Sequence, residues 1–135
     1  MKKFELTTES ITFLGRTLFR IKALISFGNV KAGELGGYIE KEGNLSHEGN
    51  AWVCGDARVC GNADIATISG FGSEYRTTTF FRTKNDEIAV KCGCFYGTLA
   101  EFREKVKETH GDTRYAKEYL MIADLMEMHF RGEEE

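Results

Sequence analysis

Residues 37–66 read GYIEKE GNLSHE GNAWVC GDARVC GNADIA, and glycine opens each of these five units. Four of the five units continue with Asn or Asp, and the last three carry Val, Val and Ile at their fifth position. Six residues suffice for one short strand and a turn, and Gly followed by Asn or Asp tolerates the left-handed backbone of a sharp corner. The repeat therefore indicates stacked coils of short parallel strands, a β-helix of about two coils.

The alternation within each unit predicts which side chains face the core of the coil. The inward positions hold small and branched residues, namely Ala51, Val53, Ala57, Val59, Ala63 and Ile65. Trp52 and Arg58 fall at outward positions and are candidate interface residues, because a large aromatic side chain anchors many protein contacts. So short a coil leaves open ends, which a flanking segment or a second copy of the chain must cover.

The segments on either side of the repeat show other patterns. Residues 1–36 hold two strand-like runs that meet near Gly15, which predicts a β-hairpin cap. Residues 71–135 hold two further strand-like runs, at 75–84 and 87–95, and then two amphipathic stretches. The first stretch follows a capping box at Thr98–Glu101, and we expect the second to run from Asp112 to about Phe130.

Together these patterns predict an α+β fold in three parts. The parts are an N-terminal β-hairpin cap at 1–36, a short β-helix at 37–70 and a C-terminal ββαα module at 71–135. The pairs Val53 with Ala57, Val59 with Ala63 and Ile65 with Ser69 resemble the hexapeptide-repeat family, which implies a left-handed β-helix.

Composition and charge limit the classes of function. The chain has 135 residues, of which 41% are hydrophobic, and a net charge of −3. These values indicate a globular domain and disfavour a nucleic-acid binder. No apolar run approaches the length of a membrane span, and the start, MKKFELTTES, lacks the apolar stretch of a signal peptide. We therefore expect a cytoplasmic protein without membrane contact.

The four cysteines, at 54, 60, 92 and 94, are expected to be reduced thiols in the cytoplasm. Their spacing is not the usual spacing of zinc ligands, so we expect neither a metal nor a cofactor, with a four-cysteine zinc site as the alternative. Cys94 lies just before a predicted helix, where a thiol becomes more reactive, and His110 lies between the two predicted helices. Cys94 and His110 are thus the candidate catalytic pair if the protein is an enzyme.

A candidate anion site lies in the run RTTTFFR at 76–82. Arg76, Thr78 and Arg82 share one face of a strand, and guanidinium groups bind phosphate or carboxylate with paired N–H donors. Thr79 and the backbone N–H groups at the helix start, Thr98, complete the predicted ligand site. The alternative is an ordinary solvated strand face.

The chain resembles a group of small phage and prophage proteins that place hexapeptide repeats before a module of the type CGCF-GTL-EF-THGD. The motifs that carry the resemblance are GELGGYIEKEGNLSHEGNAWV (33–53), DARVCGNA (56–63), TTFFR (78–82), CGCFYGTLAEFREKVKETHGD (92–112) and YAKEYL (115–120). Many hexapeptide-repeat proteins are acyltransferases, but they use more coils and a catalytic His in an insertion loop. Here His47 occupies a repeat position, which argues against that activity.

The resemblance implies a phage accessory role, and the first hypothesis is a non-catalytic anti-defence protein. It would inhibit a host immune protein, as anti-CRISPR proteins do, or sequester a nucleotide signal, which is a small phosphorylated ligand. The alternatives are an enzyme that uses Cys94 or His110 and a purely structural assembly protein. A homodimer or trimer is expected in each case.

Overall fold

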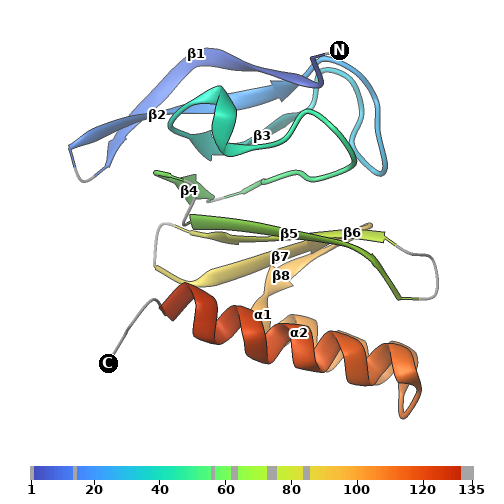
Figure 1. Ribbon diagram of the computed structural model, residues 1–135. Helices are drawn as coiled ribbons and strands as arrows, with labels where there is room; N and C mark the ends of the chain where they lie inside the picture. The colour runs from blue at the N-terminus through green and yellow to red at the C-terminus, as the bar shows by residue number, and fades with distance from the viewer. Residues whose placement is uncertain are drawn as a thin grey trace.

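The computed structural model describes residues 2–13, 15–55, 57–61, 64–72, 76–83 and 86–131. Within these residues, eight strands form two four-stranded sheets, and two helices follow them. Figure 1 shows the elements as layers, with β1 to β3 at one end and the two helices at the other. The repeat segment runs between the two sheets.

The first sheet has the order β1-β2-β3-β4. Its strands are β1 (Phe4–Phe13), β2 (Arg16–Ala23), β3 (Leu35–Ile39) and β4 (Arg58–Val59). The first two strands pair antiparallel on either side of Gly15, as the sequence predicts for this segment. Strand β3 ends inside the first repeat unit and β4 lies in the fourth, and these two strands pair in parallel.

The second sheet is antiparallel throughout and has the order β5-β6-β7-β8. Its strands are β5 (Ile65–Phe71), β6 (Arg76–Arg82), β7 (Ile88–Cys92) and β8 (Phe95–Thr98). Helices α1 (Leu99–His110) and α2 (Arg114–Arg131) cover one face of this sheet (Figure 1).

Both helices begin at side-chain caps. The hydroxyl of Thr98 accepts the N–H of Glu101, and the Glu101 carboxylate accepts the N–H of Thr98 in return, which confirms the predicted capping box. The second helix begins at Arg114, two residues after Asp112, and the hydroxyl of Thr113 accepts the N–H of Ala116.

The predicted left-handed β-helix is wrong, because the described repeat units do not wind into a closed or helical coil. The junction of the first and second units forms a 3-10 turn at Glu42–Asn44, and the fifth unit leads into β5 of the antiparallel sheet. One parallel contact remains, in which Tyr38 pairs with Arg58 and Ile39 with Val59. Five units supply few neighbours for a regular coil, and the flanking strands β2 and β6 offer longer antiparallel partners instead.

The predicted inward positions are nevertheless core positions. Ala51, Val53, Ala57 and Val59 are at most 2% exposed, and Ile65 is half-buried, whereas Ala63 lies outside the described residues. Trp52, at an outward position of the pattern, is fully buried as well. Both sides of this segment are covered because it lies between two sheets rather than on the surface of a coil.

Hydrogen bonds tie residues 51–59, the buried part of the repeat, to strands of both sheets. The N–H groups of Gly37 and Tyr38 donate to the carbonyls of Val53 and Ala57, at 3.0 and 3.1 Å. On the other side, the N–H of Trp52 donates to Oγ1 of Thr79 in β6, at 3.2 Å. The segment thus joins the two sheets, and Phe81 and Ala89 of the second sheet pack into the same core as Ile21 of the first.

Gly37, in β3, is required because Ala57 packs closely against it. A Cβ built at Gly37 would lie 2.5 Å from the Cβ of Ala57, whereas one at Gly43, another glycine of the same repeat, meets nothing within 4 Å. We therefore expect Gly37→Ala to lower the free energy of unfolding by about 1–3 kcal/mol, the usual cost of overpacking a core. The matched variant Gly43→Ala should change it by less than about 0.5 kcal/mol. Urea denaturation of both variants measures this, and equal effects would contradict the packing described here.

A buried lysine holds the N-terminus against the repeat segment. Lys3 is 1% exposed, and its Nζ donates to the carbonyl of Ala51 at 2.7 Å and lies 4.7 Å from the ring centre of Phe27. The Lys3 N–H donates to Nδ1 of His47 at 3.0 Å, so the other ring nitrogen carries the proton toward Glu42. Burial lowers the pKa of Lys3 to about 8.

This pKa shift predicts a pH-dependent stability. Between about pH 8 and 10.5, the unfolded chain keeps a proton on Lys3 that the folded chain has lost, so the free energy of unfolding rises with pH. Over that window we expect the wild type to gain about 1–3 kcal/mol relative to Lys3→Met. Urea denaturation at pH 7.5 and 10 measures the gain, with Lys2→Met as the exposed control. Parallel pH profiles for wild type and Lys3→Met would show that Lys3 is solvated.

Candidate functional site

The predicted anion-binding residues on β6 share a face but not a site. The even-numbered side chains point toward the helices, where Phe80 packs edge-on against Phe102 and Arg82 lies over the ring of Phe130. Arg76 and Arg82 stand at opposite ends of the strand, about 20 Å apart. The buried residues Thr78 and Phe80 fill the space between them.

Arg82 is held by partners within the protein. Its guanidinium pairs with the carboxylates of Asp64 and Asp86, at 2.9 and 3.0 Å, and donates to the carbonyl of Phe130. It lines a cavity of about 310 Å³ together with Arg58, and the same two carboxylates belong to that wall. The positive charge at this end of β6 is therefore compensated.

The three threonines of the predicted site have structural partners. Thr78 and Thr79 are at most 2% exposed; the hydroxyl of Thr78 donates to Sγ of Cys92 and that of Thr79 accepts from Trp52. At the start of α1, the carboxylate of Glu101 takes the position that an anion would occupy at Thr98.

Arg76, at the other end of β6, lines two cavities. The first, called the apolar cavity, measures about 340 Å³ and lies between the end of the second sheet and the two helices. Its walls are formed by Gly72, Arg76, Cys92, Cys94, Phe95, Phe102, Lys105, Val106, Thr109, His110 and Tyr119. The second, called the polar cavity, measures about 220 Å³ and lies between the two sheets. Its walls are formed by Gly28, Asn29, Val30, Asn50, Arg76, Thr77, Lys91 and Gly93.

The charge in the two cavities has one sign. Arg76 and Lys105 line the apolar cavity, and Arg76 and Lys91 line the polar one. Among the described residues of both walls there is no aspartate or glutamate. Lys105 pairs with Glu108 at 3.5 Å, outside the wall of the apolar cavity, so the polar cavity, with Arg76 and Lys91, is the better candidate for an anion.

The glycine of the β7–β8 turn places Arg76. Gly93 has a φ of +59°, and a Cβ built on it would lie 2.7 Å from Nη1 of Arg76. The guanidinium therefore rests on the bare backbone of the turn, where an alanine would displace it. The ammonium group of Lys91, two residues earlier, donates a hydrogen bond to the carbonyl of Gly93, so Lys91 and Arg76 both contact this turn.

Tyr119 closes the inner wall of the apolar cavity. Its hydroxyl donates to the carbonyl of Phe71 at 3.0 Å, and burial raises its pKa to about 12. The centre of its ring lies 5.5 Å from the ring centre of Phe102 and 6.0 Å from that of His110. The phenol is thus a neutral, hydrogen-bonded wall whose aromatic surface faces the cavity.

The candidate catalytic pair, Cys94 and His110, lines this same cavity. The described hydrogen bonds include none between the two side chains; His110 instead contacts the rings of Tyr115 and Tyr119. All four cysteines are free thiols, and the described residues contain no group of three or more His, Cys, Asp or Glu that could hold a metal ion.

The two candidate interface residues occupy different surroundings. Trp52 is fully buried, and its ring packs edge-on against Phe27 at 5.4 Å. Arg58 is half-buried, with its guanidinium 4.8 Å from the ring centre of Phe13.

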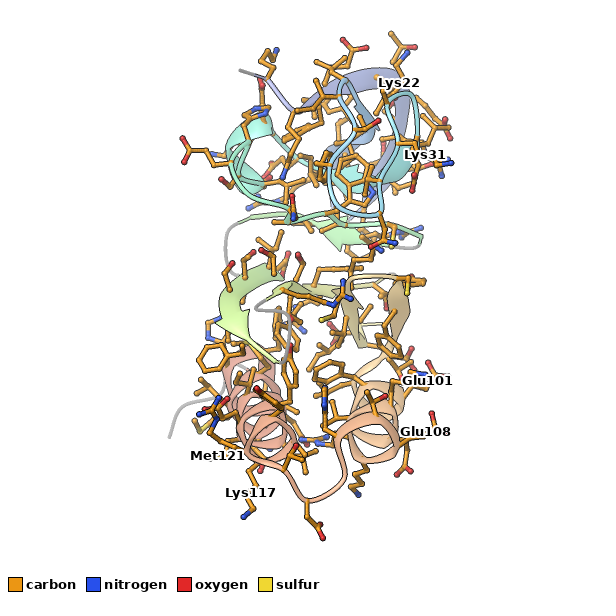
Figure 2. The ribbon with its side chains drawn as sticks, turned by 90° about the vertical axis from the view of Figure 1, so that its right-hand side faces the viewer. Lys22, Lys31, Glu101, Glu108, Lys117 and Met121 are labelled. Carbon is orange, nitrogen blue, oxygen red and sulfur yellow. The ribbon has the colours of Figure 1, made fainter. Side chains whose placement is uncertain are left out.

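Two surface features on the helices were not predicted from the sequence. Figure 2 shows Glu101 and Glu108 on the outer side of α1, away from α2. On α2, the side chains of Met121, Leu125 and Met128 are between 49% and 71% exposed, and their spacing places them on one stripe. This stripe is a candidate contact surface for the self-association expected from the sequence, which stays a prediction.

Sequence reasoning also missed Lys91, Lys105, Asn29 and Asn50. Lys91 is an isolated lysine within a strand, and Lys105 belongs to the polar face of an amphipathic helix. Neither position carries a local signal for binding. Strand pairing brings Lys91 to Arg76, the packing of α1 on the second sheet brings Lys105, and the packing of the two sheets brings Asn29 and Asn50.

Comparisons with family models, with curated proteins and with solved structures found no match to this chain. In the part of the chain that the structure describes, none of the helices is long and apolar enough to cross a membrane.

The cysteines should differ in their reactivity. Cys94 is exposed, whereas burial raises the pKa of Cys54 to about 11. At pH 8, iodoacetamide should alkylate Cys94 at least about tenfold faster than Cys54, because the thiolate is the reactive form. Peptide mass spectrometry over a time course measures both rates, and the urea-unfolded chain serves as the control in which the rates converge. Equal rates in the folded protein would contradict the burial of the repeat segment.

Proposed function

We propose that this protein is a non-catalytic binding protein of phage or prophage type that captures a small phosphorylated ligand around Arg76. In the host cell it would act against a defence pathway by withdrawing that ligand from its receptor. The observation that carries the proposal is the polar cavity, whose described wall brings Arg76 and Lys91 together with two amides and a hydroxyl and holds no aspartate or glutamate. The phage context rests on the sequence motifs described above.

The chemistry of the site favours phosphate over other anions. An arginine presents paired N–H donors that match two phosphate oxygens, and a lysine adds a point charge. The amides of Asn29 and Asn50 and the hydroxyl of Thr77 supply neutral donors in the polar cavity. A group with several oxygens and a double negative charge can satisfy more of these donors than a single carboxylate can.

Binding is favoured over catalysis by the arrangement of Cys94 and His110. A thiol nucleophile needs a base within hydrogen-bond reach, and the described contacts join His110 to tyrosine rings rather than to Cys94. The enzyme alternative predicts that Cys94→Ala abolishes an activity. The proposal predicts that this variant still binds the ligand.

The test is native mass spectrometry of the protein purified from bacterial cells, followed by denaturing release of bound molecules. We expect a phosphorus-containing adduct on the wild type and at least about a tenfold loss of its occupancy in Arg76→Ala, since a charged hydrogen-bond donor is removed. Arg114→Ala, which removes an exposed arginine of α2, should keep the adduct.

A second pair of variants separates the position of Arg76 from its presence. Gly93→Ala should lose the adduct because the new methyl group displaces the guanidinium. Gly15→Ala introduces an alanine at a similar positive φ with nothing within 4 Å, so it carries the same kind of backbone strain and should keep the adduct. An adduct that survives in Arg76→Ala, or a wild type that carries none and binds no phosphate ester in calorimetry, would refute the proposal.

A further inference from the structure

The outer face of α2 carries a row of large apolar side chains, Met121, Leu125 and Met128, which we call the methionine stripe. They are between 49% and 71% exposed and follow one another at intervals of four and three residues, so they line one side of the helix. The other large apolar side chains that are exposed among the described residues lie in or beside strands. The stripe is therefore the place on the helices where contact with another molecule would remove most apolar surface from water.

The methionine stripe lies opposite the face through which α2 packs on the second sheet. That inner face buries Ala116, Tyr119, Ile122, Ala123, Met126 and Phe130. Figure 2 shows Lys117 and Met121 on the side of α2 that points away from the sheet. A helix with two apolar sides can bury the second one only against a partner.

The flank of the stripe that faces α1 carries no loose carboxylate. Asp124 and Glu127 both accept from the guanidinium of Arg103 on α1, at 2.9 and 2.7 Å. These two charges are therefore compensated within the protein, and a partner that covers the stripe does not have to neutralise them.

A second copy of the stripe matches the first in shape and chemistry. Met121 and Met128 lie equally far from a point between Asp124 and Leu125. When two copies of α2 run antiparallel about that point, Met121 of each copy faces Met128 of the other, and the two Leu125 side chains meet near the axis. The same patch then serves both copies, as a two-fold contact requires. The flexible thioether side chains of methionine fill gaps between such helices.

Charge at the two ends of α2 sets the direction of the pairing. Arg114 and Lys117 lie in its first turns, and the sequence continues after the helix with three glutamates at 133–135. Arg114 pairs with Glu118 at 3.7 Å, so Lys117 is the main cation offered to a partner. Antiparallel pairing brings the glutamates of one copy toward Lys117 of the other, whereas parallel pairing places like charges side by side.

A membrane surface fits this face less well than a second copy does. Helices that lie on membranes carry many Lys and Arg residues beside their apolar stripe, which attract anionic lipids. Here Glu118 and Asp124 lie beside the stripe and three glutamates follow the helix, and anionic lipids repel these charges.

We propose that the methionine stripe is the contact surface of a symmetric homodimer, in which α2 of one copy packs antiparallel along α2 of a second. The inference does not depend on the proposed ligand, since the described wall of the polar cavity contains no residue of α2. Three apolar side chains from each copy make a small contact, which is typical of weak and reversible association.

Sedimentation velocity at protein concentrations from about 5 to 500 µM, a range that covers weak dimers, tests the contact. The wild type should pass from monomer to dimer as its concentration rises. Leu125→Glu should weaken dimerisation at least about tenfold, because the contact would bury a carboxylate without a partner. Leu35→Glu places the same charge at an equally exposed leucine of β3, 47% against 49%, and should dimerise as the wild type does.

Two results of this experiment would overturn the proposal. One is a wild type that stays monomeric at every concentration, and the other is a Leu125→Glu variant that dimerises as tightly as the wild type. Circular dichroism identifies a variant that fails to fold. A monomeric wild type that floats with phosphatidylglycerol vesicles, where Leu125→Glu does not, would assign the stripe to a lipid surface instead.

Engineered cysteines test the direction of the two helices. Met121→Cys and Met128→Cys are prepared separately in a Cys94→Ser background, which removes an exposed native thiol. Because a disulfide needs Cα atoms within about 7 Å, an oxidised mixture should cross-link position 121 to position 128 at least about tenfold faster than either variant cross-links to itself. A mass tag on one variant distinguishes the products. Faster cross-linking of each variant to itself would show a parallel pair and contradict the proposed dimer.

Charge exchange tests the contact between the ends of the helices. Lys117→Glu should weaken the dimer severalfold, because it would then repel the glutamates of the other copy. Lys107→Glu, at an exposed lysine of α1, should leave the dimer unchanged. Combining Lys117→Glu with Glu133→Lys and Glu134→Lys should restore the affinity of the wild type. A triple variant that dimerises no better than Lys117→Glu would refute the antiparallel arrangement of charges.

Discussion

The architecture depends on the burial of residues 51–59 between the two sheets. On one side the backbone of this segment bonds to β3, and on the other it bonds to Thr79 of β6. Trp52 is fully buried in the same layer, and Lys3 reaches in to bond the carbonyl of Ala51. Without this segment each sheet would expose an apolar face to water, so its placement stabilises both sheets at once.

The binding site is a consequence of that layer. Asn50 immediately precedes the buried segment, and its side chain meets the loop at Gly28 to form one wall of the polar cavity. The opposite wall is the end of the second sheet, with Lys91 and the Gly93 turn. The distance between the sheets therefore sets the width of the cavity. A binding site built between two layers in this way needs no flexible lid to enclose a small anion.

The two arginines of β6 show how surroundings decide function for identical side chains. Arg82 meets two carboxylates and a backbone carbonyl, so its charge stabilises the packing of α2 on the sheet. Arg76 shares the described wall of the polar cavity with Lys91 and with no aspartate or glutamate, so the wall of this cavity is basic. This difference between the two cavity walls is the basis of the function proposed here.

The sequence by itself determined the local features of this protein. The alternation that buries Val53 and Val59, the capping box at Thr98 and the common face of Arg76 and Arg82 all follow from the periods of strands and helices, which neighbouring residues set. The tertiary structure alone decided that the repeat runs between two sheets rather than coiling on itself. A six-residue unit leaves its backbone hydrogen-bonding groups open to any nearby strand. One parallel pairing within the repeat remains, between β3 and β4, and the longer partners, β2 and β6, lie outside the repeat. The tertiary structure also decided which basic side chains lie near Arg76. Lys91 and Lys105 come from two other elements, and no local sequence pattern sets the spacing of these three elements.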